Sequence, residues 1–288
     1  MHNFWDFVRL TRPHFLLGGV LLFALGAATT TGVVVVGYII GQVMVTSTQA
    51  TAQYVNEYAD VEADRTVTHR TWFSGGSGVL TEGTFRPRVA LRAAWVTSGF
   101  AAAAMLALAT RSTPAALLGL VALAVSWSYS MPPLRLLGTG WGEVIASVAV
   151  AGLVPIVGAL AQEGPLSAEL WWAVAILIPV HMAMMLAFEL PDLKSDAAVG
   201  KRVLAVRLGR VAIRYLMILL LVIAAIAATI AGLVGGLPRG AVLGTAAGVF
   251  PAAAMVAATR SGRDGVLTSS AVVTLVVVAS ALLIGLVL

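Results

Sequence analysis

"VVVVGYIIGQVMVTSTQATAQYVNEYADVEAD", residues 33–64, begins as an apolar run and ends in a segment that carries four carboxylates. At 100° per residue, its polar side chains fall within an arc of about 80° on one helical face. These residues are Gln42, Thr46, Gln49, Gln53, Asn56, Asp60 and Asp64. Exposure of this stripe to lipid would be costly, because one Asp at the bilayer centre costs about 2.5–3.5 kcal/mol. The stretch therefore predicts a membrane-spanning helix whose polar face lines a bundle interior or a water-filled cavity.

The composition of the whole chain also indicates a membrane protein. The 288 residues have a mean hydropathy of +0.95 and only 11% of them are charged, whereas soluble domains carry about a quarter charged residues. Apolar runs of about 20 residues cross a bilayer as helices. We expect an all-α bundle of about nine transmembrane helices in a single domain, residues 1–288. The expected spans are 13–31, 33–54, 89–110, 113–130, 141–161, 169–190, 211–233, 239–258 and 266–288.

The composition excludes several classes of function. Because the chain has no cysteine, it cannot form disulfides, thiolate metal sites or cysteine nucleophiles. The pI near 10.1 does not indicate a nucleic-acid partner, because the basic residues are not clustered on a soluble face. No cleavable signal peptide is expected, and no obligate protein partner is inferred.

The basic residues are distributed unevenly between the two predicted faces of the bundle. Sixteen of the 18 Lys and Arg residues fall in or beside the N-terminal segment and the loops of one face, and only Arg111 and Arg239 fall on the other. Basic residues accumulate on the cytoplasmic side of membrane proteins. We therefore expect a multi-pass protein of the cell membrane, with its N-terminus in the cytoplasm and its C-terminus outside.

A second polar stripe occurs in the predicted span 169–190 and the loop after it. The residues that share its arc of about 80° are His181, Glu189, Asp192 and Asp196. Asp60 and Asp192 lie 132 residues apart, and so do Asp64 and Asp196. This equal spacing suggests a bundle built from two pseudo-repeated four-helix units plus one further helix.

Each stripe ends in an Asp-x-x-x-Asp pair. Carboxylates at i and i+4 lie side by side on a helix and repel each other unless a cation sits between them. Mg²⁺ fits this demand, because it takes hard oxygen ligands and normally shares its site with substrate phosphates. Two alternatives remain open. The carboxylates could be solvated helix ends paired with Arg65 or Lys194, or they could bind the coupling ion of a transporter. Transporter sites lie near the bilayer midplane, whereas these pairs lie at one face.

Four segments, in order along the chain, resemble the UbiA superfamily of membrane prenyltransferases. Asn56-x-x-x-Asp60-x-x-x-Asp64, followed by Arg65, resembles its first aspartate motif. "DLKSDAAVGKRVLAVRLG" (192–209) resembles the second, "YSMPPLRL" (129–136) the segment between spans 4 and 5, and "RP" (12–13) the entry to span 1. Within this superfamily, "GSGVL" (76–80) and "GKRVLAVRLG" (200–209) look most like the branch that prenylates 1,4-dihydroxy-2-naphthoate for menaquinone.

This resemblance implies an enzyme that transfers a prenyl group from a polyprenyl diphosphate to an aromatic acceptor. It implies two Mg²⁺ ions at the cytoplasmic end of the bundle, one held by Asn56, Asp60 and Asp64 and the other by Asp192 and Asp196. The expected diphosphate-binding residues are Arg12, Arg65, Tyr129, Ser130, Arg135, Lys194 and Lys201. Glu189 or Asp192 is expected to take the proton that the acceptor loses, and Gln53 and His181 are candidates for the acceptor pocket.

The sequence leaves the acceptor open. We expect 1,4-dihydroxy-2-naphthoate together with a long polyprenyl diphosphate. A different phenolic or lipid acceptor would need the same ionisation residues, and so would a membrane terpene cyclase in which the allylic cation closes on its own chain. The isoprenoid tail needs an apolar tunnel, which a bundle that opens to membrane lipids supplies.

Overall fold

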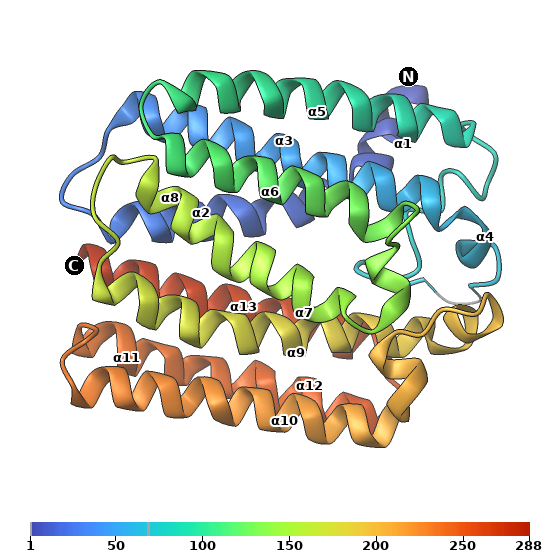
Figure 1. Cartoon of the computed structure of the whole chain (residues 1–288). Coiled ribbons are helices and arrows are strands. Elements are labelled where there is room, and N and C mark those ends of the chain that lie inside the picture. Colours follow the sequence, from blue (N-terminus) through green and yellow to red (C-terminus); the bar gives the residue numbers. More distant parts are fainter. Residues whose placement is uncertain (1, 68–69) are drawn as a thin grey trace.

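The computed structural model describes residues 2–67 and 70–288, and helices form most of this part of the chain (Figure 1). The α-helices are α1 (His2–Thr11), α2 (Leu16–Ala28), α3 (Val35–Ala59), α4 (Val61–Asp64), α5 (Pro87–Ala109), α6 (Thr113–Ser130), α7 (Gly142–Ser147), α8 (Val154–Leu160), α9 (Ala168–Ala198), α10 (Leu204–Leu233), α11 (Arg239–Thr245), α12 (Val249–Ser261) and α13 (Asp264–Val287). Short helical turns are η1 (Pro13–Phe15), η2 (Leu136–Thr139), the π-helical η3 (Val148–Leu153) and η4 (Ala246–Gly248).

The predicted all-α membrane bundle is confirmed. Eight helical segments in the described residues are long and apolar enough to cross a membrane. The 25-residue α3 is not among them, because the polar stripe lowers its hydropathy. It nevertheless packs inside the bundle against α5 and α6, as its amphipathic pattern predicts. With α3 included, the structure agrees with about nine spans, and the two termini lie at opposite ends of the bundle (Figure 1).

Two of the predicted spans are interrupted helices. The predicted span 141–161 consists of α7, a π-helical turn and α8, and the predicted span 239–258 consists of α11, a 3₁₀ turn and α12. By contrast, α9 continues through Pro179 and Pro191 to Ala198. One helix therefore carries both aspartates of the second motif.

Residues of α2, α3, α6, α8 and α9 line a central space within the bundle. In Figure 1, α3, α5 and α6 lie on one side, α9 and α13 cross the middle, and α10, α11 and α12 form an outer layer. Close helix approach is made possible by glycine, because a methyl group at Gly26 would overlap the Pro155 carbonyl and one at Gly158 would overlap the Phe23 carbonyl. Small residues let membrane helices pack closely in this way. The contact fixes α2 against α8, and these two helices form one wall of the central space.

Candidate active site

The two aspartate motifs face each other across a lysine. The Lys201 ammonium, in the loop between α9 and α10, lies 3.0 Å from Asp60 Oδ1 and 3.0 Å from Asp196 Oδ1. Asn56, one turn before Asp60 on α3, donates a 2.8 Å hydrogen bond to Asp60 Oδ2. Burial alone would lower the pKa of Lys201, but the two carboxylates outweigh burial and raise it. The first and second motifs, 132 residues apart in sequence, therefore form one charged cluster.

Asp64 adds a further carboxylate to this cluster from α4. Its side chain packs directly on Gly76, where a Cβ atom would overlap the carboxylate. Burial, together with the neighbouring charges of Asp60, Glu57 and Asp192, raises the pKa of Asp64 to about 7. The cluster therefore holds more negative charge than Lys201 neutralises, and a bound cation would stabilise it.

The loop around residues 70–78 covers the cluster. The Gly75 amide donates a 3.0 Å hydrogen bond to Asp192 Oδ2, and Ser77 donates to Glu57 from its amide (2.8 Å) and its hydroxyl (2.6 Å). Gly75 and Gly76 have φ angles of +82° and +69°, a backbone conformation that glycine adopts without strain. The sequence predicts a flexible glycine-rich stretch here, and the structure instead shows a loop hydrogen-bonded to Asp192 of the second motif and to Glu57 beside the first.

Beneath the cluster lies a cavity of about 760 Å³, whose deeper walls are apolar. The predicted site residues that line it are Arg12, Gln53, Asn56, Asp60, Asp64, Tyr129, His181, Glu189, Asp192, Asp196 and Lys201. Ser130 lies beside them and accepts a 3.4 Å hydrogen bond from Asn56. Three predicted diphosphate ligands are exposed and do not line the cavity. Arg65 pairs with Glu62 at 2.7 Å on the surface, and Lys194 and Arg135 are also exposed.

Two buried carboxyl groups hold the start of α10, which follows the loop that carries Lys201. Glu143 Oε1 accepts a 2.8 Å hydrogen bond from the Leu204 amide, and Glu189 Oε2 accepts a 3.1 Å hydrogen bond from the Ala205 amide. Both amides belong to the first turn of α10, whose N–H groups have no partner within the helix. These bonds fix the end of the loop that carries Lys201. The two carboxyl groups are also hydrogen-bonded to each other, and their remaining oxygens have no other partner among the described residues.

Glu57 and Glu143 were missed by the sequence reasoning. Glu57 lies outside the polar stripe of α3, and it contacts Arg12 (3.6 Å between Oε1 and Nη1) as well as Ser77. Glu143 is a single acidic residue at the start of a predicted span. The only signal in the sequence was its place within a predicted span, because a carboxyl group inside a membrane helix needs a partner.

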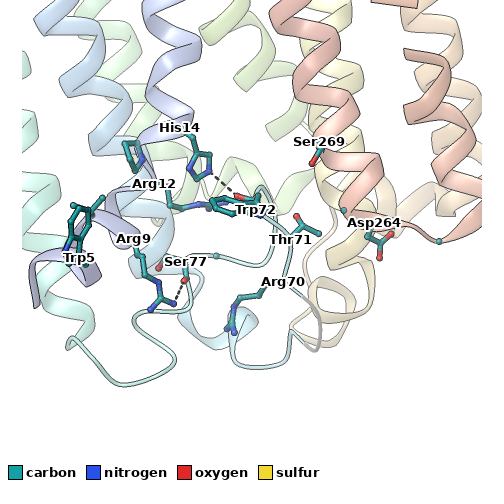
Figure 2. Close-up of a pocket in the computed structure, with 15 residues that line it drawn as sticks. Trp5, Arg9, Arg12, His14, Arg70, Thr71, Trp72, Ser77, Asp264 and Ser269 are labelled. Atoms are coloured by element: carbon teal, nitrogen blue, oxygen red, sulfur yellow. Dashed lines mark hydrogen bonds between the residues drawn. The ribbon is translucent and has the colours of Figure 1, made fainter. Parts of the chain in front are cut away.

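A second, more open pocket of about 860 Å³ adjoins the cavity and shares Arg12, His14 and Gly76 with it. Figure 2 shows three arginines beside this pocket: Arg9 from α1, Arg12 from the junction between α1 and η1, and Arg70 from the covering loop. His14 Nε2 lies 3.1 Å from the Trp72 carbonyl oxygen, and Arg9 pairs with Glu82 at 3.0 Å. The mouth of the site is therefore basic, although its arginines already have acidic or backbone partners.

The donor set fits a hard cation. Carboxylate oxygens are available from both motifs and an amide oxygen from Asn56, and Asp192 Oδ1 has no hydrogen-bond partner among the described residues. No three acidic or histidine side chains in residues 2–67 and 70–288 already converge as a metal cluster, because Lys201 lies between Asp60 and Asp196. Mg²⁺ commonly uses only one or two protein carboxylates, with waters and substrate phosphates completing its shell.

Sequence comparisons place this chain among known proteins. The UbiA prenyltransferase family matches residues 14–275. The 1,4-dihydroxy-2-naphthoate octaprenyltransferase of Bacillus subtilis (strain 168) is 24% identical over 208 residues, which cover 70% of this chain. The matched region spans 65% of that relative's length.

Solved structures share the fold. A UbiA homolog from Aeropyrum pernix K1 superposes with a TM-score of 0.74 at 17% identity, covering 94% of this chain and 98% of the other. A UbiA homolog from Archaeoglobus fulgidus, bound to DMAPP and Mg²⁺, gives a TM-score of 0.67 at 16% identity over 96% and 99% of the two chains. Digeranylgeranylglyceryl phosphate synthase superposes with a TM-score of 0.69 at 14% identity, covering 100% of this chain and 99% of the other.

Proposed function

Because the chain belongs to the UbiA prenyltransferase family, we propose that it transfers a prenyl group from a polyprenyl diphosphate to an aromatic acceptor. The observation that carries this proposal is the meeting of Asp60 and Asp196 over Lys201 at the charged end of a cavity whose other walls are mostly apolar. A diphosphate fits the charged end, and an isoprenoid tail fits the apolar walls.

We propose that Asn56, Asp60 and Asp64 hold one Mg²⁺ and that Asp192 and Asp196 hold a second. Mg²⁺ bound there would supply charge neutralisation for the diphosphate as the carbon–oxygen bond breaks. Lys201 and Arg12 both line the cavity beside these carboxylates and would pair with diphosphate oxygens. The Gly75 amide, which now donates to Asp192, is a further donor within reach.

The acceptor would enter the cavity beside the charged cluster. Carbon–oxygen cleavage leaves its electron pair on the diphosphate, and an electron-rich ring carbon of the acceptor then forms a bond to the allylic carbon. The ring regains aromaticity by losing the group on the attacked carbon, a proton in the simplest case. Asp192 lines the cavity with one oxygen that has no hydrogen-bond partner among the described residues, so it suits the role of proton acceptor better than Glu189, whose carboxyl group is hydrogen-bonded to that of Glu143.

We propose 1,4-dihydroxy-2-naphthoate as the acceptor, supported by the motifs at 76–80 and 200–209 and by the Bacillus subtilis relative. The test is an assay of the purified chain with Mg²⁺, an octaprenyl diphosphate and one acceptor at a time. We expect mass spectrometry to detect a prenylated product with the naphthoate and little with 4-hydroxybenzoate or a glycerol phosphate. If diphosphate is released and the product forms from another acceptor, the acceptor assignment is wrong. If no diphosphate is released with any acceptor, the proposed prenyl transfer is wrong.

We further propose that residues 1–288 form a single domain in the cell membrane, with the candidate active site facing the cytoplasm. The support is the concentration of basic residues at the end of the bundle that holds the aspartate motifs. A reporter fused after Leu288 is expected to be active only outside the cytoplasm, and one inserted at the exposed Gly83 only inside it. Activity of both reporters on the same side would contradict this topology.

A further inference from the structure

His181 places a ring nitrogen on the wall of the cavity, well below the aspartates. The residue lies near the middle of α9, lines the cavity and is only 4% exposed. Its Nδ1 atom lies 3.1 Å from the hydroxyl oxygen of Ser147. Its Nε2 atom has no hydrogen-bond partner among the described residues, and it is not among the polar atoms that packing encloses completely. The small exposed part of the ring therefore includes Nε2 and faces the cavity.

The contacts of Ser147 determine which nitrogen of His181 carries the proton. A serine hydroxyl has one proton to donate, and Ser147 donates it to the Glu143 carbonyl oxygen at 2.7 Å. In the contact between Ser147 and His181, the donor must therefore be Nδ1. The ring has this hydroxyl and not a carboxylate as its partner, and a buried imidazolium without an anion would be costly. The ring is therefore neutral, and Nε2 is an unprotonated nitrogen that can only accept a hydrogen bond.

A second polar side chain lies an equal distance below the other motif. His181 precedes Asp192 by 11 residues on α9, and Gln49 precedes Asp60 by 11 residues on α3. At 1.5 Å per residue, each lies about 16 Å from its aspartate along the helix axis. Gln49 also lines the cavity, and its Oε1 atom has no hydrogen-bond partner among the described residues. The cavity therefore has a polar level of its own beneath the charged cluster.

An acceptor nitrogen in this part of the cavity needs a donor from the ligand. An apolar tail that covered Nε2 would leave it without water and without a partner, which costs free energy. The π-helical turn η3 begins directly after Ser147 and also supplies cavity wall, and such turns frequently mark functional sites. The prenyl tail has a different surface, because the cavity-lining residues Leu17, Leu21, Val272 and Leu275 of α2 and α13 are apolar.

We propose that His181 Nε2 accepts a hydrogen bond from a ring hydroxyl of the aromatic acceptor, and that Ser147 holds His181 in the tautomer that can accept it. A fused ring beside the reacting carbon extends away from the diphosphate and carries a hydroxyl toward this level. The hydrogen bond leaves more electron density on the hydroxyl oxygen and, through the ring, on the carbon that attacks. The inference rests on the proposed prenyl transfer. It assigns selectivity for a hydroxylated ring to His181 as a binding residue and to Ser147 as a positioning residue.

The test compares acceptors that differ by one hydroxyl, and it measures binding without turnover. Titration calorimetry gives the Kd of each acceptor for the protein with Mg²⁺ and a prenyl thiolodiphosphate, whose carbon–sulfur bond stays intact. 1-Hydroxy-2-naphthoate and 4-hydroxy-2-naphthoate each lack one hydroxyl of 1,4-dihydroxy-2-naphthoate. We expect one of them to bind about 10- to 100-fold more weakly than the dihydroxy compound, the range for one buried acceptor left unpaired. His181→Phe keeps a ring of similar size and should remove this difference.

Ser147→Ala should also remove the difference, because the His181 proton is then free to move to Nε2. The matched control is Ser98→Ala. Ser98 is another buried hydroxyl that accepts from a ring N–H, that of Trp127 at 3.0 Å, but it does not line the cavity. The control variant should keep the wild-type difference. Nitrogen NMR of histidine-labelled protein should show an unprotonated Nε2 for His181, identified by the signal that His181→Phe removes.

Three results would overturn the inference. The first is equal affinity of the wild-type protein for the monohydroxy and dihydroxy compounds, and the second is a protonated Nε2 in the wild-type spectrum. The third is a folded His181→Phe variant that still prefers the dihydroxy compound, which would place the hydroxyl elsewhere. If the wild-type protein releases no diphosphate with any acceptor, the proposed prenyl transfer itself fails. That result differs from an active enzyme whose affinity is indifferent to the hydroxyl.

Discussion

Replacement of Asp192 by asparagine is expected to lower prenyl transfer at least about 100-fold, the loss typical when one electrostatic stabiliser is removed from an active site. Asparagine keeps the shape of the side chain and an oxygen that can still accept the Gly75 amide at position Oδ2. The covering loop should therefore stay in place while one negative charge disappears. The loss should appear as a lower turnover and as a weaker apparent affinity for Mg²⁺.

Asp60→Asn and Asp196→Asn are expected to behave in the same way, because these carboxylates face each other across Lys201. The matched control is Glu62→Gln, which removes an equal charge from the same segment but from a side chain that is 77% exposed and pairs with Arg65. Titration of Mg²⁺ against diphosphate release measures both effects. Near wild-type turnover in a double variant of Asp60 and Asp192 would refute a role for the cluster in binding cations.

Sequence periodicity predicted which faces of two helices carry the polar groups of this site, and the family resemblance added Arg12, Tyr129 and Ser130. The stripe on α3 and the stripe on α9 each place polar groups on one helical face, and burial of those faces brings Asp60 and Asp196 together. The predicted membrane bundle follows from the same reasoning, because a polar face inside an apolar chain must be covered by other helices. Lys201 was also predicted, since it follows the second motif closely.

Arg65 and Lys194 are two predicted diphosphate ligands that lie on the surface instead of in the cavity. Arg65 follows Asp64 at the end of α4, and the change of direction there turns it to the surface beside Glu62. Lys194 lies between the two aspartates on α9 but on the outer face of that helix. Glu143 and Ser147 enter the site through contacts with segments far away in sequence, and no local pattern reports such contacts.

Replacement of Lys201 by methionine is expected to make the protein strongly dependent on divalent cations for stability. Lys201 is the counter-charge for Asp60 and Asp196, and its side chain is only 18% exposed. Removal of one partner from a buried ion pair costs about 3–5 kcal/mol, because the remaining charges are left uncompensated. In EDTA, the variant should therefore unfold at a clearly lower temperature than the wild-type protein.

Added Mg²⁺ should restore much of this loss, because the ions proposed to bind at Asp60 and at Asp196 would neutralise the carboxylates that the missing ammonium leaves uncompensated. A ligand at 100 times its Kd stabilises the folded state by about 2.7 kcal/mol, so the variant should gain more from Mg²⁺ than the wild-type protein, in which Lys201 competes for the same oxygens.

Arg202→Met is the control, because Arg202 is the exposed basic neighbour in the same loop. Thermal unfolding in detergent, with EDTA or Mg²⁺, measures the difference. If Mg²⁺ raises the unfolding temperature equally in the wild-type protein and the Lys201 variant, the cation binds elsewhere. The lysine would then be a structural bridge that stays in place during the reaction.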